Sequence, residues 1–297
     1  MTQPQHRAGF VAIVGRTNAG KSTLLNQILG RKLAIVTPKP QTTRHRILGI
    51  LHRPETQFLF VDTPGWHRPR TLLGQRMLQT ARQSLGDTEL ALWVVDVARP
   101  LDSETSALAA ELQESGHPLV IAANKLDLTR RGELLTAVDG LARIVPGAHI
   151  VPVSALSGEN IEELLTTCAQ LLPESPPLYP ADAETDLPER FFAAEFVREQ
   201  LVMATEQELP YQTAVVIEDW REEAERNLVV ISAKIIVSRA SQRAIVLGER
   251  GARIREIGTR ARAEMERFFG TRVYLDLVVR VDPGWSRRVS TLNEMGI

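Results

Sequence analysis

The chain has 297 residues, with 35 Lys and Arg against 36 Asp and Glu, a hydrophobic content of 43% and a charged content of 24%. These values are ordinary for a globular protein of about two domains. They exclude wholesale disorder and collagen-like or coiled-coil architectures. The single cysteine, Cys168, excludes a disulfide scaffold and is expected to be a core residue of a helix. With no apolar run of about 18 residues and no signal peptide, a reduced cytoplasmic protein is expected.

The first part of the chain alternates short apolar runs with amphipathic stretches. The runs are bounded by turns and predict strands that are buried on both faces. This alternation predicts a doubly wound, mostly parallel α/β sheet, in which ligands bind beyond the carboxyl ends of the strands. The expected strands are residues 10–14, 58–61, 90–95, 119–123 and 150–153, and the expected helices include residues 21–29, 101–114 and 158–172.

A glycine-rich stretch lies between the first expected strand and the first expected helix. Residues 15–22 read Gly-Arg-Thr-Asn-Ala-Gly-Lys-Ser and match the pattern G-x4-G-K-S/T. Glycines let backbone N–H groups approach phosphate oxygens, and the helix N-terminus adds partial positive charge. Lys21 is predicted to reach the β- and γ-phosphates, and Ser22 to bind Mg²⁺. The predicted phosphate-binding residues are Gly15, Arg16, Thr17, Asn18, Ala19, Gly20, Lys21, Ser22 and Thr23.

A second motif, Asp-Thr-Pro-Gly, follows the expected strand at residues 58–61. The carboxylate of Asp62 is predicted to hold Mg²⁺, directly or through water, and the N–H of Gly65 to meet the γ-phosphate. Alone the motif would be an unremarkable turn, and its position at a strand end gives it its weight. The predicted nucleotide contacts here are Asp62, Thr63, Pro64, Gly65 and Trp66.

Two further strand ends carry residues suited to a guanine base. Asp127 can accept hydrogen bonds from the ring N–H and the exocyclic amine of guanine, a donor pair that adenine lacks. Asn124 can brace the neighbouring loops, the Lys125 stem can cover one face of the base, and the Ala155 N–H can donate to the guanine carbonyl. The set favours a guanine nucleotide over an adenine nucleotide, so a P-loop kinase or ATPase is disfavoured. The predicted base-binding residues are Asn124, Lys125, Leu126, Asp127, Ser154, Ala155 and Leu156.

With these motifs in order, residues 8–172 resemble the G domain of TRAFAC-class GTPases. The resemblance implies GTP hydrolysis with Mg²⁺ and a second switch from Trp66 to about Gln83. The first switch is expected in the polar, loop-like residues 39–45, whose Thr43-Arg44 pair matches the family. Thr43 is expected to bind Mg²⁺ and the γ-phosphate, with Thr42 as the alternative. Trp66 stands where Ras-like proteins place a water-orienting Gln, so slow hydrolysis or a substitute charge is expected. The predicted catalytic residues are Lys21, Thr43, Asp62 and Gly65.

The resemblance also bears on a monovalent cation. Asn18 is similar to the Asn of GTPases that bind K⁺ beside the phosphates, and such an ion could supply the electrostatic effect of an arginine finger. Bracing of the loop is the alternative role for Asn18.

Five of the 17 prolines fall in residues 173–188, which predicts an extended linker. The expected organisation is a G domain over residues 1–175, a linker over 176–189 and a second domain over 190–297. Charge in this later part is polarised. Residues 182–225 hold 13 acidic and 3 basic residues, whereas residues 234–288 hold 13 basic and 6 acidic residues. This polarity suggests a polyanionic partner on one side, although solvated faces would also explain it.

The second domain is expected to run α-β-β-α-α-β, with Gly-Glu-Arg-Gly at residues 248–251 between two helices. This G-x-x-G loop resembles the one by which KH modules clamp four nucleotides of single-stranded nucleic acid. A type II KH domain, smaller than the first domain and of the α+β class, is therefore predicted. Aromatic residues are sparse here, so backbone and base-edge contacts are expected to dominate. The predicted RNA-binding residues are Gly248, Glu249, Arg250, Gly251, Arg253, Arg255 and Arg260.

A G domain linked to a type II KH domain resembles the Era family of bacterial ribosome-assembly GTPases, over about residues 8–296. The resemblance implies binding near the 3′ end of 16S rRNA during 30S subunit maturation, and peripheral contact with the inner membrane. A monomer is expected. Glu249 and Leu156 depart from the basic residues common at these positions, which weakens the expected phosphate attraction and alters packing on the base. The rival hypotheses are a regulatory G-protein switch with a protein or membrane partner, and a tRNA-modification GTPase, which would need a further domain.

Overall fold

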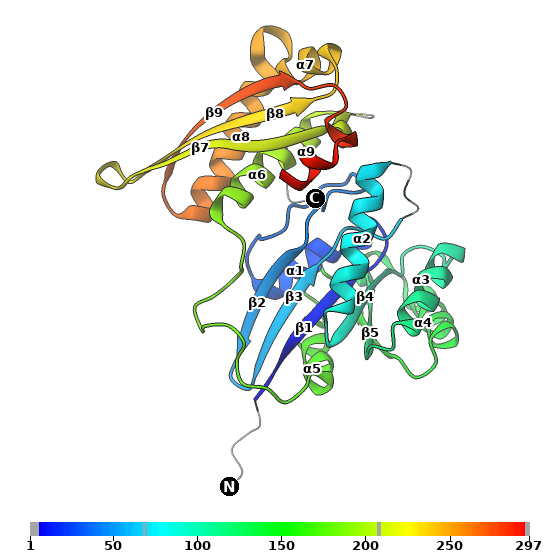
Figure 1. The fold of residues 1–297 in the computed structure, drawn as a ribbon. Coiled ribbons are helices and arrows are strands. Elements are labelled where there is room, and N and C mark those ends of the chain that lie inside the picture. The colour runs from blue at the N-terminus through cyan, green and yellow to red at the C-terminus, as the bar shows by residue number, and fades with distance from the viewer. Residues whose placement is uncertain (1–5, 68, 70, 207–208, 295–297) are drawn as a thin grey trace. The chain divides into compact units, whose positions relative to one another are not determined.

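The structure is a computed structural model that describes residues 6–67, 69, 71–206 and 209–294. Its internal contacts divide the chain into two compact units. Unit 1 comprises the residues up to Ala34 together with Thr43–Asp186, and unit 2 comprises Ile35–Thr42 together with the residues from Leu187 onward. Each unit has its own sheet (Figure 1). Within the described ranges, no helix combines the length and the apolar character needed to cross a membrane.

Unit 1 is built on a six-stranded sheet in the order β2-β3-β1-β4-β5-β6. All neighbouring pairs are parallel except β2 and β3, which are antiparallel. Strand β3 is buried along its whole length, as its almost continuous apolar run predicts. The strands are β1 (Arg7–Val14), β2 (Ile47–Arg53), β3 (Thr56–Asp62), β4 (Leu90–Asp96), β5 (Leu119–Asn124) and β6 (His149–Val153).

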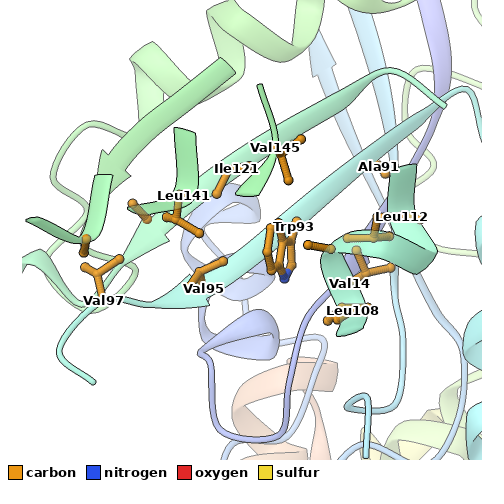
Figure 2. Close-up of a cluster of buried hydrophobic side chains, with 14 of the residues drawn as sticks. Val14, Ala91, Trp93, Val95, Val97, Leu108, Leu112, Ile121, Leu141 and Val145 are labelled. Atoms are coloured by element: carbon orange, nitrogen blue, oxygen red, sulfur yellow. The ribbon is translucent and has the colours of Figure 1, made fainter. Parts of the chain in front are cut away.

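Helices cover both faces of this sheet. The helices are α1 (Lys21–Leu29), α2 (Leu72–Gly86), α3 (Ser103–Glu114), α4 (Arg131–Ile144) and α5 (Ile161–Leu171). On one face, Trp93 of β4 is 1% exposed and belongs to a buried cluster with Leu85 of α2. Figure 2 shows Trp93 with two other members of this cluster, Leu108 of α3 and Leu141 of α4. On the other face, α1 lies so close to β2 that a Cβ on Gly49 would be 2.5 Å from a Leu29 methyl carbon. The doubly wound sheet is therefore confirmed.

Three elements of unit 1 were not predicted from the sequence. Strand β2 and helix α4 are not among the elements expected from the sequence, and α2 occupies most of the expected second switch. Helix α2 begins after Thr71, whose side chain accepts a hydrogen bond from the Gly74 N–H at 3.1 Å, a typical N-cap. Residues 68 and 70 of that switch lie outside the described residues. Cys168 is buried in α5, as predicted.

The proline-rich segment packs against β2 and β3 within unit 1, and it turns where the Ala183 N–H donates to the Pro180 carbonyl at 3.0 Å. The Gln57 side chain accepts from the N–H groups of Leu178 and Tyr179 at 2.6 and 3.0 Å and donates to the Tyr179 carbonyl at 2.8 Å. The Ile50 N–H donates to the Glu184 carbonyl at 2.9 Å. The bond to Glu184 satisfies a backbone N–H of the edge strand β2 that would otherwise be open to pairing. The Gln57 side chain, on β3, satisfies backbone groups of the proline-rich segment itself.

Unit 2 contains a three-stranded sheet in the order β7-β8-β9, with β7 antiparallel and β9 parallel to β8. Helices α6 and α8 pack against each other through aromatic rings. The Phe268 ring lies 4.8 Å from that of Phe192 and 5.3 Å from that of Phe196. The elements are α6 (Glu189–Ala204), β7 (Thr213–Glu223), β8 (Leu228–Val237), α7 (Ala240–Leu247), α8 (Ala252–Phe269), β9 (Arg272–Val281) and α9 (Val289–Glu294). The order α-β-β-α-α-β is the predicted one, followed by α9.

Candidate functional site

The glycine-rich loop joins β1 to α1, which begins at Lys21. Lys21 is 6% exposed, and its ammonium donates to the carbonyls of Gly15 at 3.1 Å and Arg16 at 3.0 Å. Burial lowers the Lys21 pKa to about 8, and the negative charge of Asp62 opposes that shift. Thr23 follows in the first turn of α1, and Asn18 at the loop tip is exposed with a left-handed φ of 62°. The loop thus holds a charged amine beneath a curled backbone.

Three oxygen-bearing side chains converge beside Lys21. The Ser22 hydroxyl donates to Asp62 Oδ2 at 2.7 Å, and the Ser22 and Thr43 hydroxyl oxygens lie 2.8 Å apart. Asp62 is fully buried, and among the described residues its Oδ1 atom has no hydrogen-bond partner. Burial raises the Asp62 pKa to about 6, against the opposing effects of Lys21 and the neighbouring hydrogen bonds. A buried carboxylate oxygen beside two hydroxyls suits a hard divalent cation.

The structure distinguishes between the two threonines of the first switch. Thr42 Oγ1 lies 2.7 Å from Thr37 Oγ1 and donates to the Lys39 carbonyl at 2.8 Å. Thr43 is the one whose hydroxyl reaches Ser22. The geometry therefore favours Thr43 as the metal ligand.

The Asp-Thr-Pro-Gly turn packs directly on the glycine-rich loop. A Cβ on Gly65 would lie 2.7 Å from Thr17 Cγ2 and 2.9 Å from Thr17 Cα, so this close approach requires glycine. The Thr63 hydroxyl donates to the Ile13 carbonyl at 3.0 Å, and Pro64 lies between these two contacts. The turn and the loop thus form one rigid wall of the site.

Trp66 points away from the phosphate loop and toward α3. Its backbone N–H donates to the Gly15 carbonyl at 2.9 Å, while its indole N–H donates to Glu111 Oε2 at 3.1 Å. The indole packs against the buried cluster around Trp93. An indole held in this way is not placed to orient an attacking water.

Arg16 of the loop is paired with acidic residues at the start of α3. Its guanidinium contacts the carboxylates of Asp102 at 2.7 Å and Glu104 at 2.5 Å. A hydrogen bond from the Thr105 backbone N–H is the main reason that the Asp102 pKa falls to about 2, with the Thr105 hydroxyl and Arg16 adding to the effect. These acidic partners were not predicted, and no motif in the sequence marks them.

Asn124, at the end of β5, bridges two loops. Its side-chain amide donates to the Ala19 carbonyl at 2.8 Å, and its side-chain oxygen accepts from the Ala155 N–H at 2.9 Å. Asn124 is 2% exposed and Ala155 is 3% exposed. The bracing role of Asn124 matches the prediction. The Ala155 N–H, which is predicted to meet the guanine carbonyl, donates here to Asn124.

The remaining base-site residues lie on the same edge of the sheet. Asp127 is exposed, and its Oδ1 accepts from the Ser154 hydroxyl at 2.5 Å. Lys125 adopts a left-handed φ of 74° and its ammonium contacts Asp96 Oδ2 at 2.7 Å, which fixes the stem. Leu126 starts a short 3-10 turn, and Leu156 is 75% exposed. The carboxylate is thus oriented by Ser154 and still open to a ligand.

The G-x-x-G loop lies between α7 and α8 of unit 2. Gly248 has a φ of 70°, and a Cβ there would be 2.7 Å from the Arg253 Cβ, so the tight turn requires glycine. Around Gly251 a Cβ would meet nothing within 4 Å, so this backbone is open to a ligand. Arg250 and Glu249 are exposed at the tip.

A groove of about 410 Å³ runs beside this loop, between α8 and β9. Its lining combines cationic, apolar and aromatic side chains, and Tyr274 is 59% exposed. The lining residues are Gly251, Ile254, Arg255, Gly258, Thr259, Arg262, Tyr274, Leu275 and Leu277. Of the predicted RNA-binding arginines, Arg255 lines the groove, whereas Arg253 donates to the Ile245 carbonyl and Arg260 pairs with Glu256 at 2.6 Å.

The β9 wall of this groove was not predicted. Tyr274 supplies an exposed aromatic ring where backbone and base-edge contacts were expected to dominate. Alternation along β9 could have identified it, because Tyr274 separates the more buried Val273 and Leu275.

Comparisons with known proteins agree with this geometry. Residues 10–125 match the family described as 50S ribosome-binding GTPase, and residues 208–286 match the KH domain family. The chain is 45% identical to GTPase Era of Syntrophus aciditrophicus over 98% of this chain and 95% of that protein. It is 44% identical to GTPase Era of Geotalea uraniireducens over 100% of this chain and 99% of that protein.

Two solved structures resemble the chain over almost its whole length. One is Era in complex with MgGDPNP and nucleotides 1506–1542 of 16S ribosomal RNA, with a TM-score of 0.95, 40% identity, and coverage of 98% of this chain and 99% of that one. The other is a variant of Aquifex aeolicus Era bound to GDP and aluminium fluoride, with a TM-score of 0.94, 39% identity and the same coverage. Both domains, in the same order, are therefore shared along the full chain, and the chain belongs to the Era family of GTPases.

Proposed function

We propose that this GTPase binds single-stranded 16S rRNA near its 3′ end through the groove of unit 2 and acts in 30S subunit assembly. The observation that carries the proposal is the groove itself, in which Arg255, Arg262 and Tyr274 stand beside an open G-x-x-G backbone. Arginines attract phosphates, and an exposed ring offers a surface for base stacking. The related Era that was solved with a 16S rRNA segment gives the RNA class.

The nucleotide site supports hydrolysis of GTP bound with Mg²⁺. Asp62, Ser22 and Thr43 would hold the ion, because a buried carboxylate oxygen without a hydrogen-bond partner in the described structure lies beside two hydroxyls. When bound, Mg²⁺ neutralises negative charge that develops on the phosphates. Lys21 exchanges the loop carbonyls for phosphate oxygens, and the loop N–H groups donate to the same oxygens.

Two further features of the site follow from its side chains. Asp127, oriented by Ser154, would accept from the two N–H groups of guanine and reject adenine. The Trp66 indole is bonded to Glu111 of α3, and no Gln amide is present at this position to orient the water. A positive charge from another group would compensate for that missing amide. We propose K⁺ near Asn18 for that role, on the family resemblance, with Asn18 exposed at the tip of the loop.

We further propose that GTP and Mg²⁺ order the two switches and so change how unit 2 engages RNA, with hydrolysis releasing that constraint. The resemblance supports a cytoplasmic monomer that contacts the inner membrane peripherally. Charge polarity along the chain also favours an anionic partner.

RNA crosslinking with sequencing, run in GTP and in GDP, tests the RNA proposal. We expect crosslinks between the 3′ end of 16S rRNA and residues 248–277. The variant Arg255→Gln should lose affinity and lower the slope of log affinity against log salt by about 0.7, the value for one lost phosphate contact on a single strand. Arg267→Gln is the matched control, because Arg267 is an exposed arginine of the same helix that is absent from the groove lining.

Two results would contradict the RNA proposal. One is equal RNA binding by Arg255→Gln and Arg267→Gln with crosslinks outside the groove. The other is capture of a protein or membrane partner by unit 2 with no RNA, which would favour a regulatory G-protein switch.

A further inference from the structure

The segment that leads to Thr43 is packed into unit 2. Residues Ile35–Thr42 precede the predicted metal ligand, yet their contacts place them with α6 and the KH fold. The Val36 N–H donates to the carboxylate of Glu199 at 3.1 Å, and Glu199 is 4% exposed. A helix of the KH domain therefore anchors part of the first switch.

A buried ion pair in the middle of α6 makes the central contact. Arg198 donates through Nε and Nη2 to the two carboxylate oxygens of Glu195, at 2.7 and 2.5 Å. The same Nη2 donates to the Thr42 carbonyl at 2.6 Å. Arg198 is 3% exposed and Glu195 is 4% exposed. Because Glu195 fixes the plane of the guanidinium, the direction of the hydrogen bond to Thr42 is fixed as well.

Arg198 is not fully satisfied by this arrangement. Its Nη1 atom is buried and has no hydrogen-bond partner in the described part of the chain. A buried guanidinium with an unsatisfied donor contributes less to stability than a well-packed apolar side chain would. The stability of unit 2 alone therefore does not explain why an arginine occupies position 198. The hydrogen bond to the Thr42 carbonyl explains it better.

A second anchor ties the same segment to the end of α6. The Lys39 ammonium donates to the carbonyl of Val202 at 2.5 Å and to that of Thr205. The last carbonyls of a helix lack partners within it and attract a cation. Helix α6 has no basic residue in its own last turn, so Lys39 supplies that charge from the switch segment.

The Thr42 carbonyl belongs to the planar peptide group that also contains the Thr43 nitrogen. Holding this carbonyl sets the direction in which the chain enters Thr43, whose hydroxyl oxygen lies 2.8 Å from that of Ser22. We propose that Arg198 is a positioning residue for GTP hydrolysis, which places the Thr43 hydroxyl in the metal-binding set by holding the Thr42 carbonyl. This inference rests on the proposed role of Thr43.

The test must separate positioning from folding. Arg198→Met alone would leave the Glu195 carboxylate buried without the arginine that neutralises it, which destabilises proteins strongly. The informative variant is Arg198→Met with Glu195→Gln, which removes both charges and the bond to Thr42 together. Arg190→Met is the matched control, because Arg190 is an exposed arginine of the same helix.

Steady-state GTP hydrolysis is measured against Mg²⁺ concentration, with GDP affinity without Mg²⁺ and RNA affinity measured in parallel. Loss of a charge-assisted hydrogen bond predicts that the double variant needs about 10-fold more Mg²⁺ for half-maximal hydrolysis. GDP and RNA affinities should stay within about 2-fold of the parent. The conservative variant Arg198→Lys, made with Glu195 intact, keeps a cationic donor and should therefore recover part of the loss.

Unchanged Mg²⁺ dependence in the double variant would overturn the inference. So would a loss of RNA affinity equal to the loss of hydrolysis, since that pattern signals a damaged unit 2. If the double variant does not fold, Lys39→Met loosens the same segment from its side and should also raise the Mg²⁺ requirement. A parent protein that hydrolyses GTP without any Mg²⁺ requirement would instead refute the proposed role of Thr43.

Discussion

Replacing Asn124 with alanine should damage unit 1 even before nucleotide binds. The side chain is 2% exposed and joins the glycine-rich loop to the loop after β6 through two hydrogen bonds, to Ala19 at 2.8 Å and from Ala155 at 2.9 Å. Asn124→Ala leaves one buried carbonyl and one buried N–H without partners. At about 1–3 kcal/mol for each unsatisfied group, the free energy of unfolding should fall by about 2–6 kcal/mol.

Thermal and denaturant unfolding without nucleotide measure this loss. A domain of this size loses about 2–4 °C in Tm for each kcal/mol, so a drop of about 4–24 °C is expected. Guanine nucleotide affinity should fall as well, because both loops that line the site lose their brace. The control is Asn160→Gly, which removes an exposed side chain with one bond to the Pro152 carbonyl and keeps a residue suited to the left-handed φ of 60°.

The expected order is a small change for Asn160→Gly and a large one for Asn124→Ala. Equal stability of the two variants, or a Tm for Asn124→Ala within about 2 °C of the parent, would show that water or a relaxed backbone satisfies the groups that lost their partner. The bracing role of Asn124 would then be wrong.

Three other outcomes follow from the site and the core. Asp127→Asn should weaken GTP binding and favour xanthine nucleotides, because an amide can donate where a carboxylate only accepts; unchanged discrimination in competition titrations would remove Asp127 from the base site. Lys21→Ala should abolish nucleotide binding in calorimetry, since it deletes the buried ammonium beneath the phosphate loop, and full affinity would refute the assignment. Burial raises the Cys168 pKa from 9.0 to about 12, so the thiol's contribution to stability is complete below pH 9 and lost as the pH rises toward 12. Between those pH values the free energy of unfolding of the parent should fall by about 1.4 kcal/mol per pH unit more than that of Cys168→Ala. Denaturant titrations in which the two proteins show the same pH dependence would count against a buried thiol.

The nucleotide site was predictable because its residues are local to strand ends. Each motif follows a buried apolar run, and parallel strands bring their carboxyl ends to one edge of a sheet. Lys21, Asp62 and Asn124 therefore fall together once the strands are assigned, and the structure places them so. Residue identity and position along the chain are therefore enough to predict where these side chains of the nucleotide site lie.

Bond partners inside the site were less predictable. The Ala155 N–H and the Trp66 indole are each satisfied by a residue distant in sequence, Asn124 and Glu111 respectively. Nothing in the local sequence says which of several acceptors a buried donor will find, because tertiary packing decides the choice. The same holds for Tyr274, whose exposure depends on where α8 lies against β9.

The segment Ile35–Thr42 shows that a domain cannot always be assigned from position in the sequence, because its contacts place it in unit 2. It has no helical or strand period and lies between elements of unit 1, so sequence position assigns it to the G domain. Its partners on α6 lie 156 or more residues away, as the bonds from Arg198 to Thr42 and from Lys39 to Val202 show. Two of those partners are buried ionic groups, Arg198 and Glu199, which are rarely buried without a partner that neutralises or binds them. Charged residues at buried positions of α6 thus indicate that this helix contacts polar groups as well as an apolar core.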